Sequence, residues 1–270
     1  MSPSIGVIGL GRMAQALVEP LLTSGSVAPQ SLVATVGRPD SVQALKQGAF
    51  SQSSIHPAAS TEAAAVWTAP LQLLAIKPQQ VEAVAAAAPP VDGSPLLVSV
   101  LAGVNLKRLQ RLFPGHRVVR AVPNTPSLVG QGLTALAWGD GISSAQRQQV
   151  QDLFAGVSEV LELPEDKLDP FLALTSSGPA FVALVAEAMA DGAVAAGLPR
   201  DLAHRLAHRT LAGSAALLDQ RQLHPALLKD MVTSPGGTTI AGVRALERAG
   251  LRSALMEAVI AAAERSRELA

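Results

Sequence analysis

A glycine-rich turn near the start of the chain sets the strongest limit on its fold. The apolar run Ile5–Gly9 predicts a short strand, and the segment Gly9–Ala14 (Gly-Leu-Gly-Arg-Met-Ala) follows it directly. This Gly-x-Gly-x-x-Ala pattern is a form of the dinucleotide fingerprint, whose glycines allow a tight turn and a close approach of pyrophosphate to the backbone. A predicted helix over 12–22 and a second predicted strand over 31–36 complete the expected context. We therefore expect a Rossmann-type unit that binds a dinucleotide at this turn.

The end of the second predicted strand indicates which dinucleotide binds. An NAD site usually carries Asp or Glu about 20 residues beyond the glycines, where the carboxylate bonds the ribose 2′-hydroxyl. Here the strand runs into Gly37-Arg38-Pro39, and the nearest acid, Asp40, lies beyond the proline. The guanidinium of Arg38 offers a planar set of donors that suits a 2′-phosphate. We predict NADPH as the cofactor, with NADH weaker. The alternative is that Arg38 is only a solvated loop residue.

Strand and helix patterns alternate as far as residue 162. Strands are predicted at 71–76, 96–100, 117–121 and 133–137, with helices at 78–88, 105–112 and 144–155. Such alternation predicts a doubly wound, mainly parallel sheet covered on both faces. After Pro164 the patterns are helical only, at 167–175, 179–197, 201–219, 224–232, 239–249 and 252–268. We predict an α/β Rossmann domain over 1–162 and an all-helical domain over 163–270.

The turns that follow the predicted strands are expected to carry the rest of the site. Ligands of open α/β sheets gather outside the carboxyl ends of the strands. The segment 75–78 ends one strand there, Ala102-Gly103 ends the next, and 123–126 follows the one after. The ammonium of Lys77 is placed to contact the nicotinamide ribose. The alternative is that Lys77 has only a structural role. A role for Lys77 as a catalytic proton donor is a weaker alternative.

A second glycine-rich turn lies in the helical half. The run 234–239 (Ser-Pro-Gly-Gly-Thr-Thr) opens onto a helical pattern that Gly250 ends. Pro235 fixes one φ angle, while the two glycines permit positive φ and leave backbone N–H groups uncovered. Thr238 or Thr239 is predicted to cap the helix and to present a hydroxyl. Such a turn suits a small anion. The alternative is an ordinary helix N-terminus.

Another turn of this kind is Ser176-Ser177-Gly178-Pro179. Ser177 or Gly178 is predicted to cap the long helix that follows, and Pro179 suits its first turn. The chain thus offers two uncovered helix starts in its helical half. If they converge, they would hold a carboxylate without an arginine.

Composition excludes several other classes of protein. The net charge is +0, the aromatic content is 3% and tyrosine is absent, which argues against a nucleic-acid partner. Without cysteine there is no disulfide, thiol nucleophile or thiolate metal site. His204 and His208 share a helical face with interleaved arginines, so we read them as solvated and predict no metal.

We expect neither a membrane span nor a secretory signal. Residues 179–197 are apolar but carry Glu187 and Asp191, which favours a buried or interface helix. The first residues lack a basic region followed by an apolar core. The expected location is therefore cytoplasmic.

Taken together, these motifs resemble the pyrroline-5-carboxylate reductase family over nearly the whole chain. The segments that carry the resemblance are Ile5–Ala14, Leu74–Gln79, Val98–Val104, Arg120–Val129, Ser176–Phe181 and Leu228–Ala241. The most specific of them contains Lys-Asp-Met-Val-x-Ser-Pro-Gly-Gly-Thr-Thr. The resemblance implies a Rossmann domain followed by an all-helical dimerisation domain that interlocks with a partner's. The implied assembly is a homodimer that can associate further.

The resemblance also implies site residues, position by position. Cofactor contacts would come from Gly9, Gly11, Met13, Arg38, Ala75, Lys77, Pro78, Val100, Leu101 and Ala102, to which we add Arg12 of the same glycine turn. Substrate contacts would come from Ser234, Gly237, Thr238 and Thr239, with Thr239 as the catalytic residue beside the ring nitrogen. We add Ser177 and Gly178 as substrate residues because they form the other uncovered helix start. Glu165 falls near a position that borders the proline site in some members.

Three positions depart from the family's usual residues. Arg12 stands where Asn is common, Ser176 replaces a frequent Gly, and Phe181 replaces a frequent Tyr. The last change removes a hydroxyl, so any role of that hydroxyl in the family does not carry over. None of the three removes a group that the implied chemistry plainly needs.

The implied reaction is the NADPH-dependent reduction of 1-pyrroline-5-carboxylate to L-proline, with hydride transferred to the imine carbon. A protonated imine is strongly electrophilic, so the site mainly needs orientation and electrostatic support. One alternative is a reductase of a related cyclic imine, such as the six-membered homologue. Another is a nucleotide sensor without activity, which would predict a degraded Ser-Pro-Gly-Gly-Thr-Thr turn.

Overall fold

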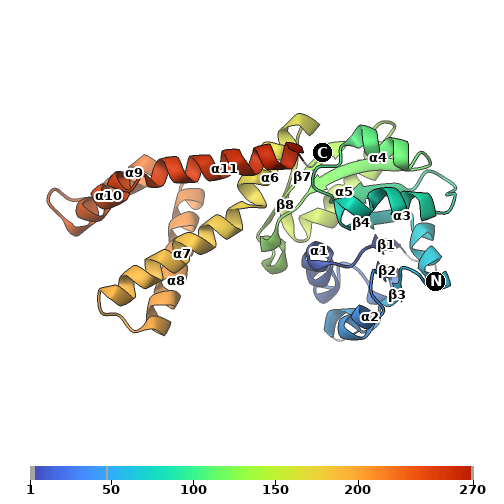
Figure 1. Cartoon of the computed structure of the whole chain (residues 1–270), viewed down its shortest axis with the longest axis horizontal. Helices are drawn as coiled ribbons and strands as arrows, with labels where there is room; N and C mark the ends of the chain where they lie inside the picture. Colours follow the sequence, from blue (N-terminus) through green and yellow to red (C-terminus); the bar gives the residue numbers. More distant parts are fainter. Residues whose placement is uncertain (1–3, 47, 269–270) are drawn as a thin grey trace. The chain divides into compact units, whose positions relative to one another are not determined.

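One eight-stranded sheet forms the centre of the N-terminal part of the chain (Figure 1). The computed structural model describes residues 4–46 and 48–268. The strands are β1 (Ile5–Ile8), β2 (Leu32–Val36), β3 (Ser54–Pro57), β4 (Leu71–Leu74), β5 (Leu96–Ser99), β6 (Arg117–Val122), β7 (Gly132–Trp138) and β8 (Ser158–Glu162). They lie in the order β3-β2-β1-β4-β5-β6-β7-β8.

The sheet is mainly parallel, as the alternation of strands and helices predicts. Among the strands in the described part of the chain, only β6 and β7 pair antiparallel, with Arg120 opposite Ala137. These two strands are joined by the short segment that contains the 3-10 helix η5 (Thr125–Val129), and a connection without a crossover helix cannot join parallel neighbours. The strand order reverses beside β1, because β2 lies on one side of it and β4 on the other. That reversal marks the usual ligand crevice of such sheets.

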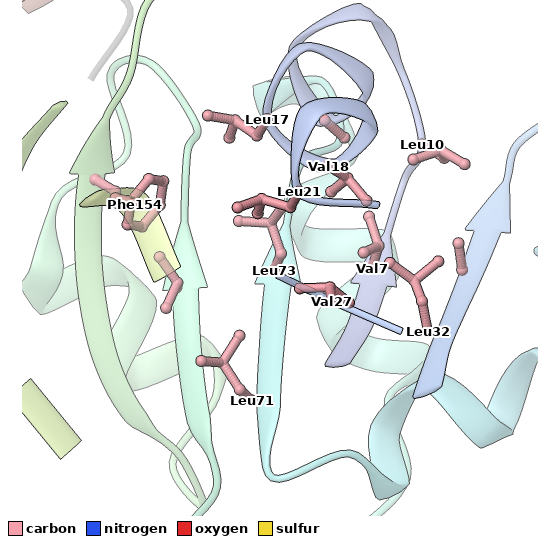
Figure 2. Packing of buried hydrophobic residues seen from close by; sticks show 14 of the residues in the cluster. Val7, Leu10, Leu17, Val18, Leu21, Val27, Leu32, Leu71, Leu73 and Phe154 are labelled. Carbon is pink, nitrogen blue, oxygen red and sulfur yellow. The ribbon is translucent and has the colours of Figure 1, made fainter. Parts of the chain in front are cut away.

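Helices cover both faces of the sheet. One apolar cluster joins the sheet to α1 (Arg12–Thr23), α2 (Asp40–Leu45) and α5 (Ser144–Ala155). Figure 2 shows Leu17, Val18 and Leu21 of α1 facing the strand residues Val7 and Leu73. On the other face, a second cluster packs η3 (Thr61–Thr68), α3 (Val81–Ala87) and α4 (Leu106–Leu112) against the sheet. This packing confirms a doubly wound sheet.

The sequence patterns do not predict β3 and β8. β3 is the edge strand beside β2 and ends at Pro57, and β8 is the opposite edge strand beside β7. The short helices α2 and η3 also lie in segments for which no element is predicted. The strand predicted over 71–76 ends at Leu74, because the chain then turns into η4 (Pro78–Gln80).

The C-terminal part of the chain is helical, as predicted. A 3-10 helix, η6 (Glu165–Lys167), precedes α6 (Leu168–Thr175), α7 (Gly178–Ala195), α8 (Arg200–Gln220), α9 (Pro225–Met231), α10 (Thr238–Arg248) and α11 (Leu251–Glu268). α7 and α8 pack closely through small side chains, with Ala190, Ala203 and Ala207 buried between them. Asp191 of α7 also pairs with Arg200 of α8 at 2.6 Å.

By packing, the chain divides into two compact units. The first, here called the sheet unit, comprises residues 1–176 and 262–270, and the second, the helical unit, comprises Ser177–Ala261. The chain therefore leaves the sheet unit after Ser176 and returns to it at Ala262. The domains predicted over 1–162 and 163–270 stay a prediction. They were divided by a change in sequence pattern, whereas the compact units are defined by how the residues pack.

One apolar run has the length of a membrane span. By length and composition, Glu165–Ala195 could cross a membrane. Only 11% of its most apolar window is buried within the chain, so the rest of this surface is left for a partner or a membrane to cover. An interface helix gives the same signal. Glu187 and Asp191 are both exposed on it, which fits the predicted interface better than lipid.

Candidate active site

The turn between β1 and α1 is held in a conformation that leaves helix N–H groups uncovered. The N–H groups of Gly9 and Leu10 donate to the carbonyl of Thr35 at 3.2 and 2.9 Å, which ties the turn to the end of β2. Gly11 is the N-cap of α1 and has no side chain to accept from the first turn. The following N–H groups, from Arg12 and Met13, lack partners within the helix, as at any helix start. Such a start attracts an anion.

The two glycines of this turn differ in what surrounds them. Gly9 has a φ of +91°, and a Cβ there would come within 2.9 Å of the Ala75 carbonyl oxygen. Gly11 has nothing within 4 Å of the place where a Cβ would lie. Gly9 is therefore needed for the backbone, whereas the space beside Gly11 can admit a phosphate. These environments fit the predicted roles of both residues toward a dinucleotide.

Arg38 lies just beyond the end of β2, as predicted. Its side chain is exposed, and its carbonyl accepts from the N–H of Ser41 at 3.1 Å in the first turn of α2. Asp40 is the first residue of α2, so its carboxylate lies beyond the strand tip. β2 is the neighbour of β1, and their parallel register brings both carboxyl ends to one edge. Arg38 and the glycine turn thus share that edge.

The next two strand ends belong to the same edge. β4 pairs parallel with β1, and the N–H of Ala75 donates to the carbonyl of Ile8 at 2.9 Å. Lys77 follows with an exposed side chain, and its N–H donates to Gln80 at 3.2 Å, which starts η4 at Pro78. β4 therefore presents all three predicted residues, Ala75, Lys77 and Pro78, in one short turn.

The turn after β5 contains the remaining predicted cofactor residues. The N–H of Val100 donates to the carbonyl of Leu74 at 3.0 Å, so this turn lies beside the end of β4. Val100 and Ala102 are half-buried, but Leu101 is 2% exposed and its side chain packs in the core below the sheet. At Leu101 only the backbone remains available to a ligand.

A groove that the sequence patterns do not indicate opens beside the same strands. It has a volume of about 320 Å³ and is lined by residues of β1, β2, η3 and α3, among them Thr35, Ser60 and Thr61. Hydrogen bonds from its own backbone N–H, and then from Ser60 and Thr61, hold the pKa of the neighbouring Glu62 carboxyl below its usual value. Ser60 and Thr61 lie in a segment without strand or glycine signals, so only the fold reveals them.

In the helical unit, the Ser-Pro-Gly-Gly-Thr-Thr run forms a tight turn before α10. The N–H of Gly237 donates to the carbonyl of Ser234 at 3.1 Å, with Pro235 and Gly236 between them. Gly236 has a φ of +70°, as the third residue of a type II turn requires. A Cβ on Gly237 would collide with the Ser234 hydroxyl. Gly236 is thus needed for this shape, and a side chain at Gly237 would require the Ser234 hydroxyl to move.

The predicted threonine cap is wrong. Gly237, with extended backbone, is the N-cap of α10, and Thr238 and Thr239 are the first two helical residues. The helix starts one residue earlier than a threonine cap would require, because Gly237 can take the cap position without a side chain. The N–H groups of the first turn consequently have no side-chain cap. The Thr239 side chain is half-buried and that of Thr238 is exposed.

The other predicted substrate turn starts α7. Ser177 occupies the N-cap position without a side-chain cap bond, Gly178 begins the helix and Pro179 follows in the first turn. A Cβ on Gly178 would meet nothing within 4 Å. Figure 1 shows the start of α7 and the helix α10 at opposite ends of the helical unit. The two turns therefore do not meet within one chain.

Glu165 is engaged inside the sheet unit. Its Oε1 accepts from the N–H of Leu106 at 2.7 Å and lies 3.2 Å from Nη1 of Arg120, whose side chain is 4% exposed. Asp169 lies 3.5 Å from Nη2 of the same guanidinium. Because the Glu165 carboxylate is held by a buried arginine and a helix N–H, its ion pair with Arg120 has a structural role in the sheet unit. Within residues 4–46 and 48–268, no cluster of His, Asp or Glu is placed to hold a metal ion.

Comparisons with known proteins bear on the whole chain. Residues 165–269 match the family described as pyrroline-5-carboxylate reductase dimerisation, and residues 4–103 match the family of NADP oxidoreductase, coenzyme F420-dependent. The pyrroline-5-carboxylate reductase of Synechocystis sp. is 44% identical over 269 residues, which cover 100% of this chain and 99% of that protein. The chain belongs to the pyrroline-5-carboxylate reductase family. The family's enzyme from Glycine max is 39% identical over 99% of this chain and 96% of its own length.

Solved structures of pyrroline-5-carboxylate reductases have the same fold. That of Plasmodium falciparum, with NADP bound, aligns with a TM-score of 0.88 and 28% identity over 99% of this chain and 98% of its own. That of Streptococcus pyogenes aligns with a TM-score of 0.85 and 28% identity over 98% of both chains. Membership of the pyrroline-5-carboxylate reductase family thus confirms the resemblance on which the site residues were predicted.

Proposed function

We propose that this protein reduces 1-pyrroline-5-carboxylate to L-proline with NADPH. The observation that carries the proposal is the 44% identity to a protein named pyrroline-5-carboxylate reductase over the full chain. Two local features support it. The β1–α1 turn has the open helix start that a dinucleotide phosphate needs, and the turn before α10 has two glycines that leave N–H groups uncovered.

The cofactor would lie along the carboxyl edge of β2, β1, β4 and β5. Gly9, Gly11, Arg12 and Met13 would meet its phosphates, and Arg38 would meet the 2′-phosphate. The ribose and nicotinamide would lie against the remaining predicted residues, Ala75, Lys77, Pro78 and the Val100–Ala102 turn, where Leu101 offers only its backbone. We assign the adenine half to the groove that Ser60 and Thr61 line. Bound NADPH supplies the hydride.

The substrate would be held by neutral groups. The N–H of Thr238 and the Ser234 hydroxyl suit its carboxylate, and Gly237 lines the turn without a side chain while its own N–H is bonded to the Ser234 carbonyl. Ser177 and Gly178 offer a second helix start. Thr239 would orient the ring nitrogen through its hydroxyl. Such a site places no fixed cation beside the iminium. A fixed cation there would disfavour the positive charge that makes the imine carbon electrophilic.

We further propose that the active protein is a homodimer, which can associate into larger assemblies. Large apolar side chains are exposed along the helical unit, for example Leu184 at 65%, Met231 at 68% and Met256 at 59%. So many exposed large apolar side chains on one set of helices are typical of an interface. Because the two substrate turns lie at opposite ends of one helical unit, a site that uses both needs a second copy. A cytoplasmic location remains a prediction from the sequence.

The test is turnover by the purified protein. NADPH consumption and proline formation are measured with 1-pyrroline-5-carboxylate and, separately, with the six-membered homologue. We expect proline as the product and faster turnover of the five-membered ring. Faster turnover of the six-membered ring would favour the related cyclic-imine reductase, and NADPH binding without any turnover would favour the sensor.

A further inference from the structure

The helical unit is an insertion in the sheet unit, so two stretches of backbone connect the units. The chain leaves the sheet unit between Ser176 and Ser177, here called the first crossing, and returns between Ala261 and Ala262, the second crossing. The proposed cofactor residues lie before the first crossing, and all the proposed substrate residues lie between the two. Because the substrate residues reach a cofactor on a helical unit, of the same or of the partner copy, how firmly each crossing is held bears on the alignment of hydride donor and acceptor.

The first crossing is fastened to the turn that follows β6. The Asn124 side chain is 4% exposed and donates from Nδ2 to the carbonyl of Thr175 at 3.0 Å. Its Oδ1 accepts from the N–H of Leu133 at 2.8 Å, which fixes the amide orientation. One residue along, the Ser176 hydroxyl donates to the carbonyl of Pro123 at 2.9 Å. The end of α6 is therefore bonded twice, at the last two residues before the chain leaves.

The second crossing is fastened to β6 itself, through a chain of polar contacts. Ser266 of α11 is 3% exposed and donates to Oδ1 of Asp169 at 2.8 Å. The same Oδ1 lies 3.5 Å from Nη2 of Arg120, and Nη1 of that guanidinium holds Glu165 at 3.2 Å. Arg120 thus fixes the carboxylate that receives α11 soon after the chain returns.

We propose that Arg120 and Asn124 are positioning residues for the reaction, which fasten both crossings to one strand and its following turn. β6 lies next to β5, whose end carries the proposed Val100–Ala102 contacts, so the anchors and that part of the cofactor site share one rigid sheet. Buried polar groups of this kind, which bond several partners at once, hold a geometry more than they add stability. The inference rests on the proposed reduction, because its consequence is the alignment of hydride transfer.

The test weakens the anchors without leaving a buried charge unpaired. Ser176→Ala and Ser266→Ala each remove one hydroxyl donor and keep Arg120 and Asn124 in place, and the double variant affects both crossings. Ser158→Ala is the matched control. Its hydroxyl is also buried in the sheet unit and donates to the carbonyl of Phe154 at 3.0 Å, but it touches neither crossing.

Measurements of kinetics, cofactor binding, hydrogen exchange and Tm separate positioning from a loss of folded protein. We expect the double variant to lose about fivefold to tenfold in kcat, with an NADPH Kd within about twofold of wild type. The primary deuterium isotope effect on kcat, measured with NADPH deuterated at the transferred position, should rise because hydride transfer becomes slower. Backbone hydrogen exchange should accelerate at 172–178 and 258–268. Ser158→Ala should lower Tm alone, and Ser176→Thr should keep the wild-type isotope effect.

The outcomes are distinct. An unchanged kcat and isotope effect in the double variant would overturn the proposal, and so would an equal loss of kcat in Ser158→Ala. If the wild-type protein does not form proline, the proposed function fails, and exchange at the two crossings then decides whether the anchors hold them. Unchanged exchange in the double variant would reject the anchors themselves.

Discussion

Arg38 is the residue on which the cofactor prediction depends, because it lies at the strand end where an NAD site would carry an acid. Arg38→Asp would delete a phosphate contact and add repulsion. We expect the KM for NADPH to rise on the order of tenfold to a hundredfold, and that for NADH to change far less. Steady-state rates with both cofactors measure this, with the exposed Arg111→Asp on α4 as the control. Equal use of both cofactors by wild type, with equal effects in the variant, would show that Arg38 does not select the cofactor.

Thr239 is the residue we place nearest the imine nitrogen. Thr239→Val keeps the side-chain shape and removes the hydroxyl, and losing a hydrogen bond at the reacting atom costs on the order of 1–3 kcal/mol. We expect kcat/KM to fall roughly tenfold to a hundredfold, while the NADPH Kd from fluorescence titration stays nearly constant. Thr238→Val is the comparison. If Thr239→Val leaves kcat/KM unchanged, Thr238 becomes the better candidate.

At the scale of residues, sequence predicts backbone requirements better than side-chain roles. Gly9 and Gly236 were predictable because positive φ nearly demands glycine, and both have it. The cap of α10 was predicted wrongly, because a glycine and a threonine can both start a helix and sequence does not say which residue does. Ser60 and Thr61 could not be found, since a groove between η3 and the sheet exists only once the chain has folded.

At the scale of elements, His116 links the start of β6 to its neighbours and has a pH-dependent effect on stability. Its Nε2 lies 3.0 Å from Oε1 of Gln72 on β4, and the rings of Trp67 and Phe113 pack around it. Burial lowers the pKa of His116 from 6.5, partly opposed by a backbone hydrogen bond to Phe113. His116 therefore binds a proton less readily in the folded protein than in the unfolded chain.

The expected sign follows from that difference. Above pH 6.5 the ring is neutral in both states, and as pH falls below that value the free energy of unfolding should decrease. Urea unfolding at about pH 7.5 and about pH 5.5 would measure it. His116→Gln should show a smaller decrease between the two, whereas His208→Gln, at an exposed position on α8, should match wild type. An equal decrease in all three proteins would exclude His116 as the source.

The elements that sequence missed are short and lie at the edges. β3 and β8 are the two edge strands of the sheet, and a strand with one neighbour and partial exposure needs no strict apolar alternation. The central strands β1, β2, β4 and β5 were found because they are predominantly apolar, as is typical of strands covered on both faces. The long helices were found by their length and helical pattern, and among them α7 has so few polar residues that a partner is needed to cover it.

At the scale of the whole molecule, the exposed apolar helices predict self-association. Light scattering at micromolar concentration should give a dimer or larger species, and a single monomer peak would refute this. Leu184→Glu, on the exposed face of α7, should shift the protein toward monomer and lower turnover. Ala145→Glu adds the same charge at an exposed position on α5 of the sheet unit and should change neither. Association unaffected by Leu184→Glu would place the interface elsewhere.

The return of the chain to the sheet unit at Ala262 has a consequence for how the protein is made. During synthesis, residues 1–176 emerge before the whole of Ser177–Ala261, and only afterwards does Ser266 become able to reach Asp169. The sheet unit therefore cannot complete its own contacts on the ribosome until the inserted helices have been translated. Until then Asp169 lacks its hydrogen bond from Ser266, so this contact can form only when the helical insertion is already present.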